Sequence, residues 1–135
     1  MMNENVASIM SKNLITLNAN DNLTALLEVM KQNRVHHFPV VEGKKLVGIV
    51  TTWDLLKLNR RFEDYDAIKV SDVMTRKLAY LNPGDPIGSA AEVLLKNYFH
   101  ALPIVDDDRN LIGIVTNFDI LKYEYLKEYP NENLE

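Results

Sequence analysis

The amino-acid sequence predicts an α/β (α+β) fold made of two tandem copies of a β-α-β-β-α unit. Three observations support this prediction: an internal repeat, an alternation of strand-like with helix-like segments, and an ordinary globular composition. The chain has 135 residues, of which 47% are hydrophobic and 25% are charged. Such a composition is typical of a folded globular protein, and the length suits one compact domain or two small repeats that share a core.

The repeat emerges when residues 6–41 are placed over residues 70–105, and residues 46–57 over residues 111–122. In this alignment 20 of 48 positions are identical, which is far more than chance allows. The turns between the two aligned stretches differ in length by one residue. The chain therefore contains two copies of one structural unit, and two copies packed together can bury apolar faces that one copy would expose.

Each copy is predicted to contain a strand, a helix, a β-hairpin and a second helix. Apolar residues recur at i, i+3, i+4 and i+7 from Leu23 and again from Ile87, as on one face of a helix. Two apolar runs joined by a tight charged turn then predict a hairpin. In chain order we expect short strands at 14–17 and 78–81, helices from 23 and 87, hairpins over 37–50 and 102–115, and second helices opening at Thr51 and Thr116.

The boundaries of these elements follow from local signals. Asp85 followed by Pro86 is typical of an N-cap and first helical residue, and Asp21 holds the same cap position in the first copy. Pro130 is expected to end the last helix. The predicted organisation is a first repeat over 1–58, a polar, partly helical connector over 59–69, a second repeat over 70–122, and a helix extension and tail over 123–135.

Composition disfavours several classes of function. The absence of cysteine excludes disulfides, thiolate zinc sites and cysteine nucleophiles. The net charge of -4 argues against broad nucleic-acid binding, which needs a basic face. No stretch approaches the roughly 18 apolar residues of a membrane span, and the N-terminus lacks the pattern of a signal peptide. We therefore expect a cytoplasmic protein with no nucleic-acid and no membrane partner.

Familiar enzyme motifs are missing from the sequence, which has no phosphate loop, no dinucleotide glycine fingerprint and no nucleophile elbow. The histidines, His36, His37 and His100, lie at one repeat-equivalent position or beside it. Adjacent strand residues point to opposite faces, so His36 and His37 make a poor metal site and are better explained as structural or site-lining residues. We predict no catalytic residue, no metal and no required cofactor.

The most informative motif is Gly-Ile-Val-Thr-x-x-Asp, found at residues 48–54 and 113–119. A strand ends and a helix begins here, so the threonine and aspartate are placed as a capping box. The same corner can bind a ligand, because a carboxylate accepts hydrogen bonds from a ribose diol and a helix N-terminus favours anions. Retention of both residues in both copies favours the ligand-binding interpretation, since a residue with only a capping role could have been replaced by Ser, Asn or Glu.

Three motifs in combination resemble the cystathionine-β-synthase (CBS) domain. Each copy opens with Val-x-x-(Val/Ile)-Met-(Ser/Thr), continues with (Phe/Leu)-Pro-(Val/Ile)-Val, and ends with Leu-(Val/Ile)-Gly-Ile-Val-Thr-x-x-Asp-(Leu/Ile)-Leu. The resemblance covers residues 6–122 and implies a CBS pair, or Bateman module, whose repeats pack through their sheets with pseudo-twofold symmetry. It also implies two clefts that bind AMP, ADP, ATP, S-adenosylmethionine or related nucleotides.

The resemblance further implies how each cleft is composed. Residues around the Leu-Pro of one repeat surround the adenine, and the Thr-x-x-Asp of the other repeat contacts ribose and phosphate. One cleft is expected to combine Val35, His36, His37 and Pro39 with Ile114, Thr116 and Asp119. The other is expected to combine Phe99, His100, Ala101 and Pro103 with Ile49, Thr51 and Asp54.

The two expected clefts differ at the adenine wall. Ala101 is small, as that wall requires, whereas His37 in the matching position is bulky. The cleft that contains Ala101 and Asp54 is therefore the favoured ligand site.

The phosphate side of each cleft departs from the family pattern. Trp53 and Phe118 stand where a small hydroxyl residue would help to hold phosphate, which argues against tight triphosphate binding. Core packing or subunit contact explains these aromatics equally well. Lys12, Arg76 and Lys77 are candidate phosphate contacts, although loop residues of this kind are commonly only solvated.

Two main hypotheses of function follow, from different classes. In the first, a nucleotide shifts one repeat against the other, and a separate, unidentified effector protein reads the change; a homodimer through the helices that contain Asp54 and Asp119 is implied by the resemblance. In the alternative, the chain is a non-catalytic interaction or scaffold protein whose clefts are empty or filled by side chains such as His37. A metal-dependent enzyme built on the histidines is a third hypothesis.

Overall fold

The computed structural model describes residues 2–33, 35–97 and 99–134. The chain forms two compact units, and each contains one hairpin and its own hydrophobic core. The unit that carries the first hairpin, called here the first-repeat unit, comprises Ile15–Leu78 and Asp108–Leu111. The second-repeat unit comprises Met1–Leu14, Ala79–Asp107 and Ile112–Glu135.

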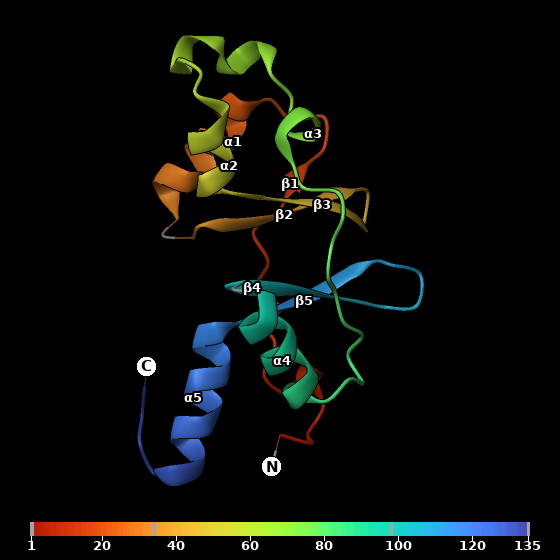
Figure 1. Ribbon diagram of the computed structural model, residues 1–135, viewed down its shortest axis with the longest axis vertical. Helices are drawn as coiled ribbons and strands as arrows, with labels where there is room; N and C mark the ends of the chain where they lie inside the picture. Colours follow the sequence, from red (N-terminus) through yellow and green to blue (C-terminus); the bar gives the residue numbers. More distant parts are fainter. Residues whose placement is uncertain (1, 34, 98, 135) are drawn as a thin grey trace. The chain divides into compact units, whose positions relative to one another are not determined.

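The first-repeat unit is built around a three-stranded sheet in the order β1-β2-β3 (Figure 1). Strand β2 is central, parallel to β1 and antiparallel to β3. The elements of this unit are β1 (Leu17–Asn18), α1 (Leu23–Gln32), β2 (His37–Glu42), β3 (Lys45–Thr51), α2 (Thr52–Leu58), the 3-10 helix η2 (Phe62–Ala67) and α3 (Val70–Val73).

The geometry of the hairpin β2-β3 explains why it tolerates a glycine in its turn and a proline in its first strand. Gly43 in the turn has φ 63, a left-handed conformation that glycine adopts without steric penalty. Pro39 lies opposite Ile49, whose N–H and C=O both bond to Thr75 on the far side of β3. The missing N–H of Pro39 therefore removes no hydrogen bond between the two strands.

The core of the first-repeat unit lies between the sheet and its helices. The predicted apolar stripe of α1 supplies Leu23 and Leu26, and β2 supplies Phe38 and Val40, all fully buried. Burial of each such side chain contributes about 1.5–3 kcal/mol. The buried members of this core are Leu17, Ala19, Leu23, Leu26, Phe38, Val40, Val50, Tyr65, Val70 and Met74.

The second-repeat unit repeats this plan with a two-stranded sheet. Its elements are the 3-10 helix η1 (Val6–Ser8), α4 (Ile87–Asn97), β4 (Ala101–Val105), β5 (Leu111–Thr116) and α5 (Asn117–Glu128). Its core contains Val6, Ala90, Leu94, Leu102, Ile104 and Val115. Helix α5 ends before Pro130, as predicted, and α1, α4 and both hairpins are likewise confirmed.

The opening segment of each repeat belongs to the unit of the other repeat. Val6 is buried in the core that contains β4 and β5, while Val70 is buried in the core that contains β2 and β3. The backbone bonds are equivalent: Val6 N–H donates to Asp85 O at 2.7 Å, and Val70 N–H donates to Asp21 O at 2.7 Å. The compact units therefore differ from the repeats, which run continuously along the sequence.

The short strands expected at 14–17 and 78–81 are mostly irregular. Strand β1 consists only of Leu17–Asn18, and in the second copy Leu81 forms an isolated parallel bridge with Ile104. Ile15 and Ala79, which precede them, pack against the two cores but lie outside the strands. Their run is too short to distinguish a strand from an apolar loop.

The predicted helix caps at Asp21 and Asp85 are wrong. Asn22 is the N-cap of α1, and its side chain accepts the N–H of Ala25 at 3.0 Å. The two aspartates instead close the preceding loops, since Asp21 Oδ2 accepts the N–H of Asn18 at 2.9 Å and Asp85 Oδ2 that of Asn82 at 2.8 Å. These two hydrogen bonds fix the conformation of the loops that precede α1 and α4.

Candidate functional site

The Thr-x-x-Asp of the first repeat forms a capping box where β3 meets α2. Thr51 is the N-cap, and its hydroxyl accepts the N–H of Asp54 at 3.4 Å. Asp54 Oδ2 accepts the N–H of Thr51 at 2.8 Å. The Asp54 side chain is 9% exposed, and its Oδ1 lies 3.6 Å from Lys57 Nζ. Both carboxylate oxygens of Asp54 therefore have partners within α2 or at its cap.

The second copy has the same cap with one difference. The hydroxyl of Thr116 accepts the N–H of Asp119 at 3.1 Å, and Asp119 Oδ2 accepts the N–H of Thr116 at 2.9 Å. No ion pair within the described residues joins Asp119 to Lys122, the repeat equivalent of Lys57. The capping interpretation is thus confirmed in both copies, and it leaves the ligand-binding interpretation open because a capping carboxylate can accept further hydrogen bonds.

The residues expected around the base lie beside the Thr-x-x-Asp of their own repeat. His37 pairs with Thr51 across β2 and β3, and Thr52 N–H donates to His36 O at 3.2 Å. The same contact recurs where Asn117 N–H donates to His100 O at 3.1 Å. Each unit therefore carries one set of base-side residues and one Thr-x-x-Asp at adjoining strand ends.

The base-side residues differ in exposure between the copies. Ala101 is buried, whereas His37 is half-buried. Val35 is half-buried, and its equivalent Phe99 is exposed. His100 is exposed, and its Nδ1 lies 3.2 Å from Asn117 Nδ2. Pro39 and Pro103 are buried strand residues, so their contribution is to the shape of the strand.

The opening segments bring the candidate phosphate contacts to these strand ends. Ser11 forms a two-bond bridge with Ile114, which places Lys12 in the second-repeat unit next to β5. Thr75 forms the equivalent bridge with Ile49, which places Arg76 and Lys77 next to β3. All three basic residues are exposed, and Arg76 also donates to Ser71 O at 3.1 Å.

Sequence reasoning missed Ser11 and Thr75. These residues occupy the outer edges of β5 and β3, where they use the backbone groups of Ile114 and Ile49. The signal that could have found them is the polar residue after each opening methionine, which the alignment places at equivalent positions. Because of this pairing, Ile49 and Ile114 can offer a ligand their side chains but not their backbone N–H groups.

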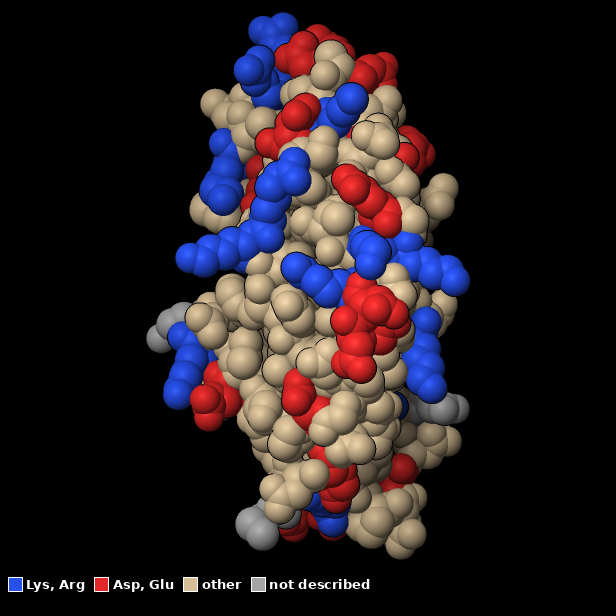
Figure 2. All heavy atoms as spheres, turned by 90° about the vertical axis from the view of Figure 1, so that its right-hand side faces the viewer, with Lys and Arg blue, Asp and Glu red and all other residues tan. Residues whose placement is uncertain are grey.

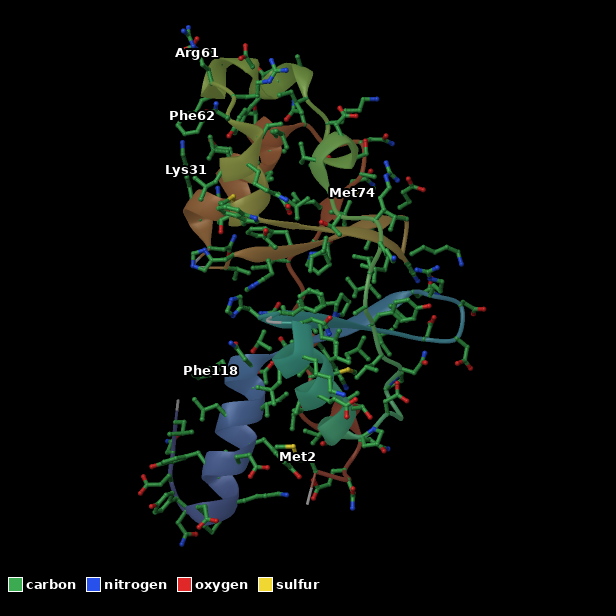
Figure 3. All side chains as sticks on the ribbon, viewed as in Figure 1. Met2, Lys31, Arg61, Phe62, Met74 and Phe118 are labelled. Atoms are coloured by element: carbon green, nitrogen blue, oxygen red, sulfur yellow. The ribbon has the colours of Figure 1, made fainter. Side chains whose placement is uncertain are left out.

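Trp53 and Phe118 are exposed, so core packing does not explain them. Trp53 is 62% exposed and Phe118 64% exposed. Phe118 projects outward from the first turn of α5 (Figure 3). The remaining explanations from the sequence are subunit contact and a role beside the site.

The charges give no large area of one sign on the face that Figure 2 shows, where basic and acidic side chains are mixed. Among the described residues, no group of three or more His, Asp or Glu side chains is arranged to hold a metal ion. In the same part of the chain, none of the helices combines the length and apolar character that a membrane crossing requires.

Comparison with known proteins identifies the family. The family model described as CBS domain matches residues 6–61 and 70–125. The chain belongs to the CBS domain family. It contains two CBS domains in tandem, and its β-α-β-β-α repeats have the fold of solved CBS pairs.

Three similar proteins illustrate the range of this family. An uncharacterized protein of Methanocaldococcus jannaschii, MJ0188, is 29% identical over 133 residues; the alignment covers 97% of this chain and 48% of that protein, so the chain spans about half of its length. The CBS domain pair of protein MJ0100, solved with 5′-methylthioadenosine and S-adenosyl-L-methionine, is 30% identical with a TM-score of 0.78 and covers 91% of this chain and 97% of that one. CBSX2 from Arabidopsis thaliana, solved with AMP, is 27% identical with a TM-score of 0.82 and covers 93% of this chain and 98% of that one.

The predicted composition of the two clefts stays a prediction. Each expected cleft takes its base-side residues from one compact unit and its Thr-x-x-Asp from the other. Within each unit, the structure brings three separate segments together. These are the residues around β2 or β4, the strand-to-helix corner, and the exchanged opening segment.

Proposed function

We propose that this CBS pair is a regulatory module that binds an adenosine-bearing ligand and does not catalyse a reaction. The observation that carries the proposal is the likeness, over more than 90% of the chain, to two CBS pairs solved with AMP or with S-adenosyl-L-methionine and 5′-methylthioadenosine. All three compounds contain adenosine. The residues at both strand-to-helix corners suit such ligands, because they offer hydroxyl, carboxylate and helix N-terminal groups.

The ribose is the part of the ligand that Asp54 and Asp119 would bind. A ribose diol presents two donors, and each aspartate has acceptor capacity beyond its capping bond. In the first repeat, the ligand would displace the Lys57 ammonium from Asp54. This ammonium lies 3.6 Å from Asp54 Oδ1, and the Lys57 side chain is 55% exposed. An exposed ion pair of this kind contributes little to stability, so its loss costs little.

The residues at the start of β4 would bind the base, and the basic residues of the opening segment would bind the phosphate. Ala101, which is small and buried, would form the adenine wall of the cleft in which Thr51 and Asp54 of the other repeat contact ribose and phosphate. This cleft is the favoured site. The exposed side chains of Arg76 and Lys77 follow Thr75 on the edge of β3 and would contact a phosphate. The exposed aromatic Trp53 beside Asp54 favours a monophosphate or a sulfonium ligand over a tightly held triphosphate.

A thermal-shift screen of the purified protein tests the proposal. AMP, ADP, ATP, S-adenosylmethionine, GTP and NADH would each be added in excess. A ligand at 100 times its Kd stabilises the folded state by about 2.7 kcal/mol, which raises Tm measurably for a chain of this size. We expect a selective rise with an adenosine compound.

Two variants separate binding from capping in this screen. Asp54→Ala removes a candidate ribose contact and a cap, so the ligand-induced rise should disappear. Asp72→Ala is the matched control, because Asp72 Oδ2 accepts the N–H of Lys69 at 3.1 Å at the start of α3 and is not a candidate site residue. If no adenosine compound raises Tm, the scaffold alternative is favoured and a protein partner becomes the object of search.

We also propose that the module forms a homodimer through α2 and α5 and regulates a separate effector protein. Both helices present an exposed aromatic residue followed by an exposed leucine, Trp53 and Leu56 on α2 and Phe118 and Leu121 on α5. Repetition of this apolar pair in both copies distinguishes it from single exposed hydrophobic residues, which are common on protein surfaces.

A further inference from the structure

A groove lies between η1 and α5 inside the second-repeat unit, with a volume of about 420 Å³. This volume falls within the range of small-molecule sites. One face of α5 forms its long wall, and η1 forms the opposite wall. The lining residues are Ser8, Ile9, Asp119, Lys122, Tyr123, Leu126 and Lys127.

The lining combines positive charge with apolar surface. Among the lining residues, Lys122 and Lys127 carry ammonium groups and Asp119 carries a carboxylate, which already accepts the N–H of Thr116. Lys127 Nζ also lies 3.9 Å from Oε2 of Glu4, which is not a lining residue. The Glu4 side chain is exposed, so this pair contributes little to stability and an anionic ligand can replace it. Ile9 and Leu126 supply apolar contact. A ligand that complements this groove carries an anionic group at one end and an apolar body.

The hydroxyl of Tyr123 gives an independent indication of a ligand. Within the part of the chain that the structure describes, this hydroxyl is buried and has no hydrogen-bond partner. Buried polar groups in folded proteins nearly always have a partner. Lys127 Nζ lies 4.4 Å from the centroid of the Tyr123 ring, so the hydroxyl and a positive charge belong to one local cluster.

Comparison of the two repeats shows that these groups are not a consequence of the fold. At the matching place in the first-repeat unit, the equivalents of Ser8, Tyr123 and Lys127 are Asp72, Leu58 and Phe62. Leu58 packs against the hydrophobic core, and Phe62 makes an edge contact with Tyr65. Of the two units, the second-repeat unit alone therefore combines a serine hydroxyl, a tyrosine and a second lysine at this place.

We propose that the groove between η1 and α5 binds a small organic acid. Its carboxylate lies between Lys122 and Lys127 and accepts a hydrogen bond from the Tyr123 hydroxyl. Its apolar body contacts Ile9 and Leu126. This site lies within one unit and shares only Asp119 with the proposed adenosine sites.

A titration followed by NMR tests the proposal. Benzoate and hexanoate would be added to the 15N-labelled chain, with benzamide and hexanol as neutral analogues. We expect saturable shifts of backbone amides in residues 8–9 and 119–127 with the acids only. Lys122→Ala should weaken binding about tenfold or more, because a charge-assisted hydrogen bond is lost. Lys96→Ala is the matched control, since Lys96 is an exposed lysine of α4 that pairs with Glu92.

The Tyr123→Phe variant separates ligand binding from a structural role. It removes a hydroxyl that has no hydrogen-bond partner among the described residues, so Tm without ligand should stay the same or rise, while affinity for benzoate should fall. Three results would overturn the proposal. These are no saturable shift with either acid, equal affinity in Lys122→Ala and Lys96→Ala, or inorganic phosphate binding as tightly as benzoate, which would indicate an anion site without the apolar component.

Discussion

At the corner between β5 and α5, the Thr116 hydroxyl and the Asp119 carboxylate satisfy N–H groups that the start of a helix leaves without partners. The equivalent pair, Thr51 and Asp54, does the same for α2. A residue that stabilises a helix and contacts a ligand is held in one orientation before the ligand arrives. This preorganisation reduces the entropy lost on binding.

Removal of the Thr116 hydroxyl should destabilise the chain. Thr116→Ala leaves the Asp119 N–H without its partner and should lower the free energy of unfolding by about 0.5–2 kcal/mol. Thr116→Ser keeps the hydroxyl and should lower it by much less. Urea unfolding of both variants measures the difference. Equal loss in the two variants would contradict a capping role for this hydroxyl.

Single residues show where sequence reasoning succeeds and where it stops. The capping boxes at Thr51 and Thr116 were predictable because all their bonds form within four residues. The cap at Asn22 was missed because Asp21 is an equally good cap by type, and only the loop bond to Asn18 decides between them. The exposure of Trp53 was not predictable, since an aromatic residue suits a core as well as an interface.

At the scale of elements, a glycine in each hairpin permits the exchange of opening segments. A Cβ on Gly48 would overlap Met74 Sδ, and a Cβ on Gly113 would overlap Met10 Sδ. Met74 follows α3 and lies beside β3 (Figure 3). In each hairpin, the absence of a side chain at this glycine therefore leaves room for the methionine of the other repeat to pack.

Substitution of Gly113 tests this contact. Gly113→Ala should lower the free energy of unfolding by about 1–3 kcal/mol, because the added methyl group overlaps Met10. In a Met10→Ala background the same substitution should cost much less, which a double-mutant cycle measures. Gly84→Ala is the matched control, because a Cβ there would have no atom of the described residues within 4 Å. Additive effects of the two substitutions would show that Met10 and Gly113 do not contact each other.

The helices and hairpins could be predicted from the sequence, whereas the exchange could not. Periodicity identifies an apolar face, and the alignment identifies equivalent residues such as Val6 and Val70. Neither tells which copy an opening segment packs against, because both cores offer the same apolar surface. For the same reason, the candidate site residues could be named from the sequence, but their position beside Ser11 and Thr75 could not be predicted.

For the whole molecule, the apolar residues on α2 and α5 predict self-association. Phe118→Asp and Trp53→Asp together should convert a dimer into a monomer, because burying the two new carboxylates would cost more than the contact gains. Sedimentation velocity measures the mass directly. Lys96→Asp, which places a new carboxylate on the exposed surface of α4, is the control. A wild-type chain that sediments as a monomer at micromolar concentration would contradict this prediction.

The most direct test of the account is an isothermal titration of the chain with AMP and, separately, with S-adenosylmethionine. We predict saturable binding of at least one of these compounds to the wild-type chain. Binding should be lost in Asp54→Ala/Asp119→Ala and retained in Asp72→Ala, while all three proteins remain folded by circular dichroism. Absence of binding to the wild-type chain, or equal affinity in the double variant, would contradict the proposal that this CBS pair binds adenosine-bearing ligands.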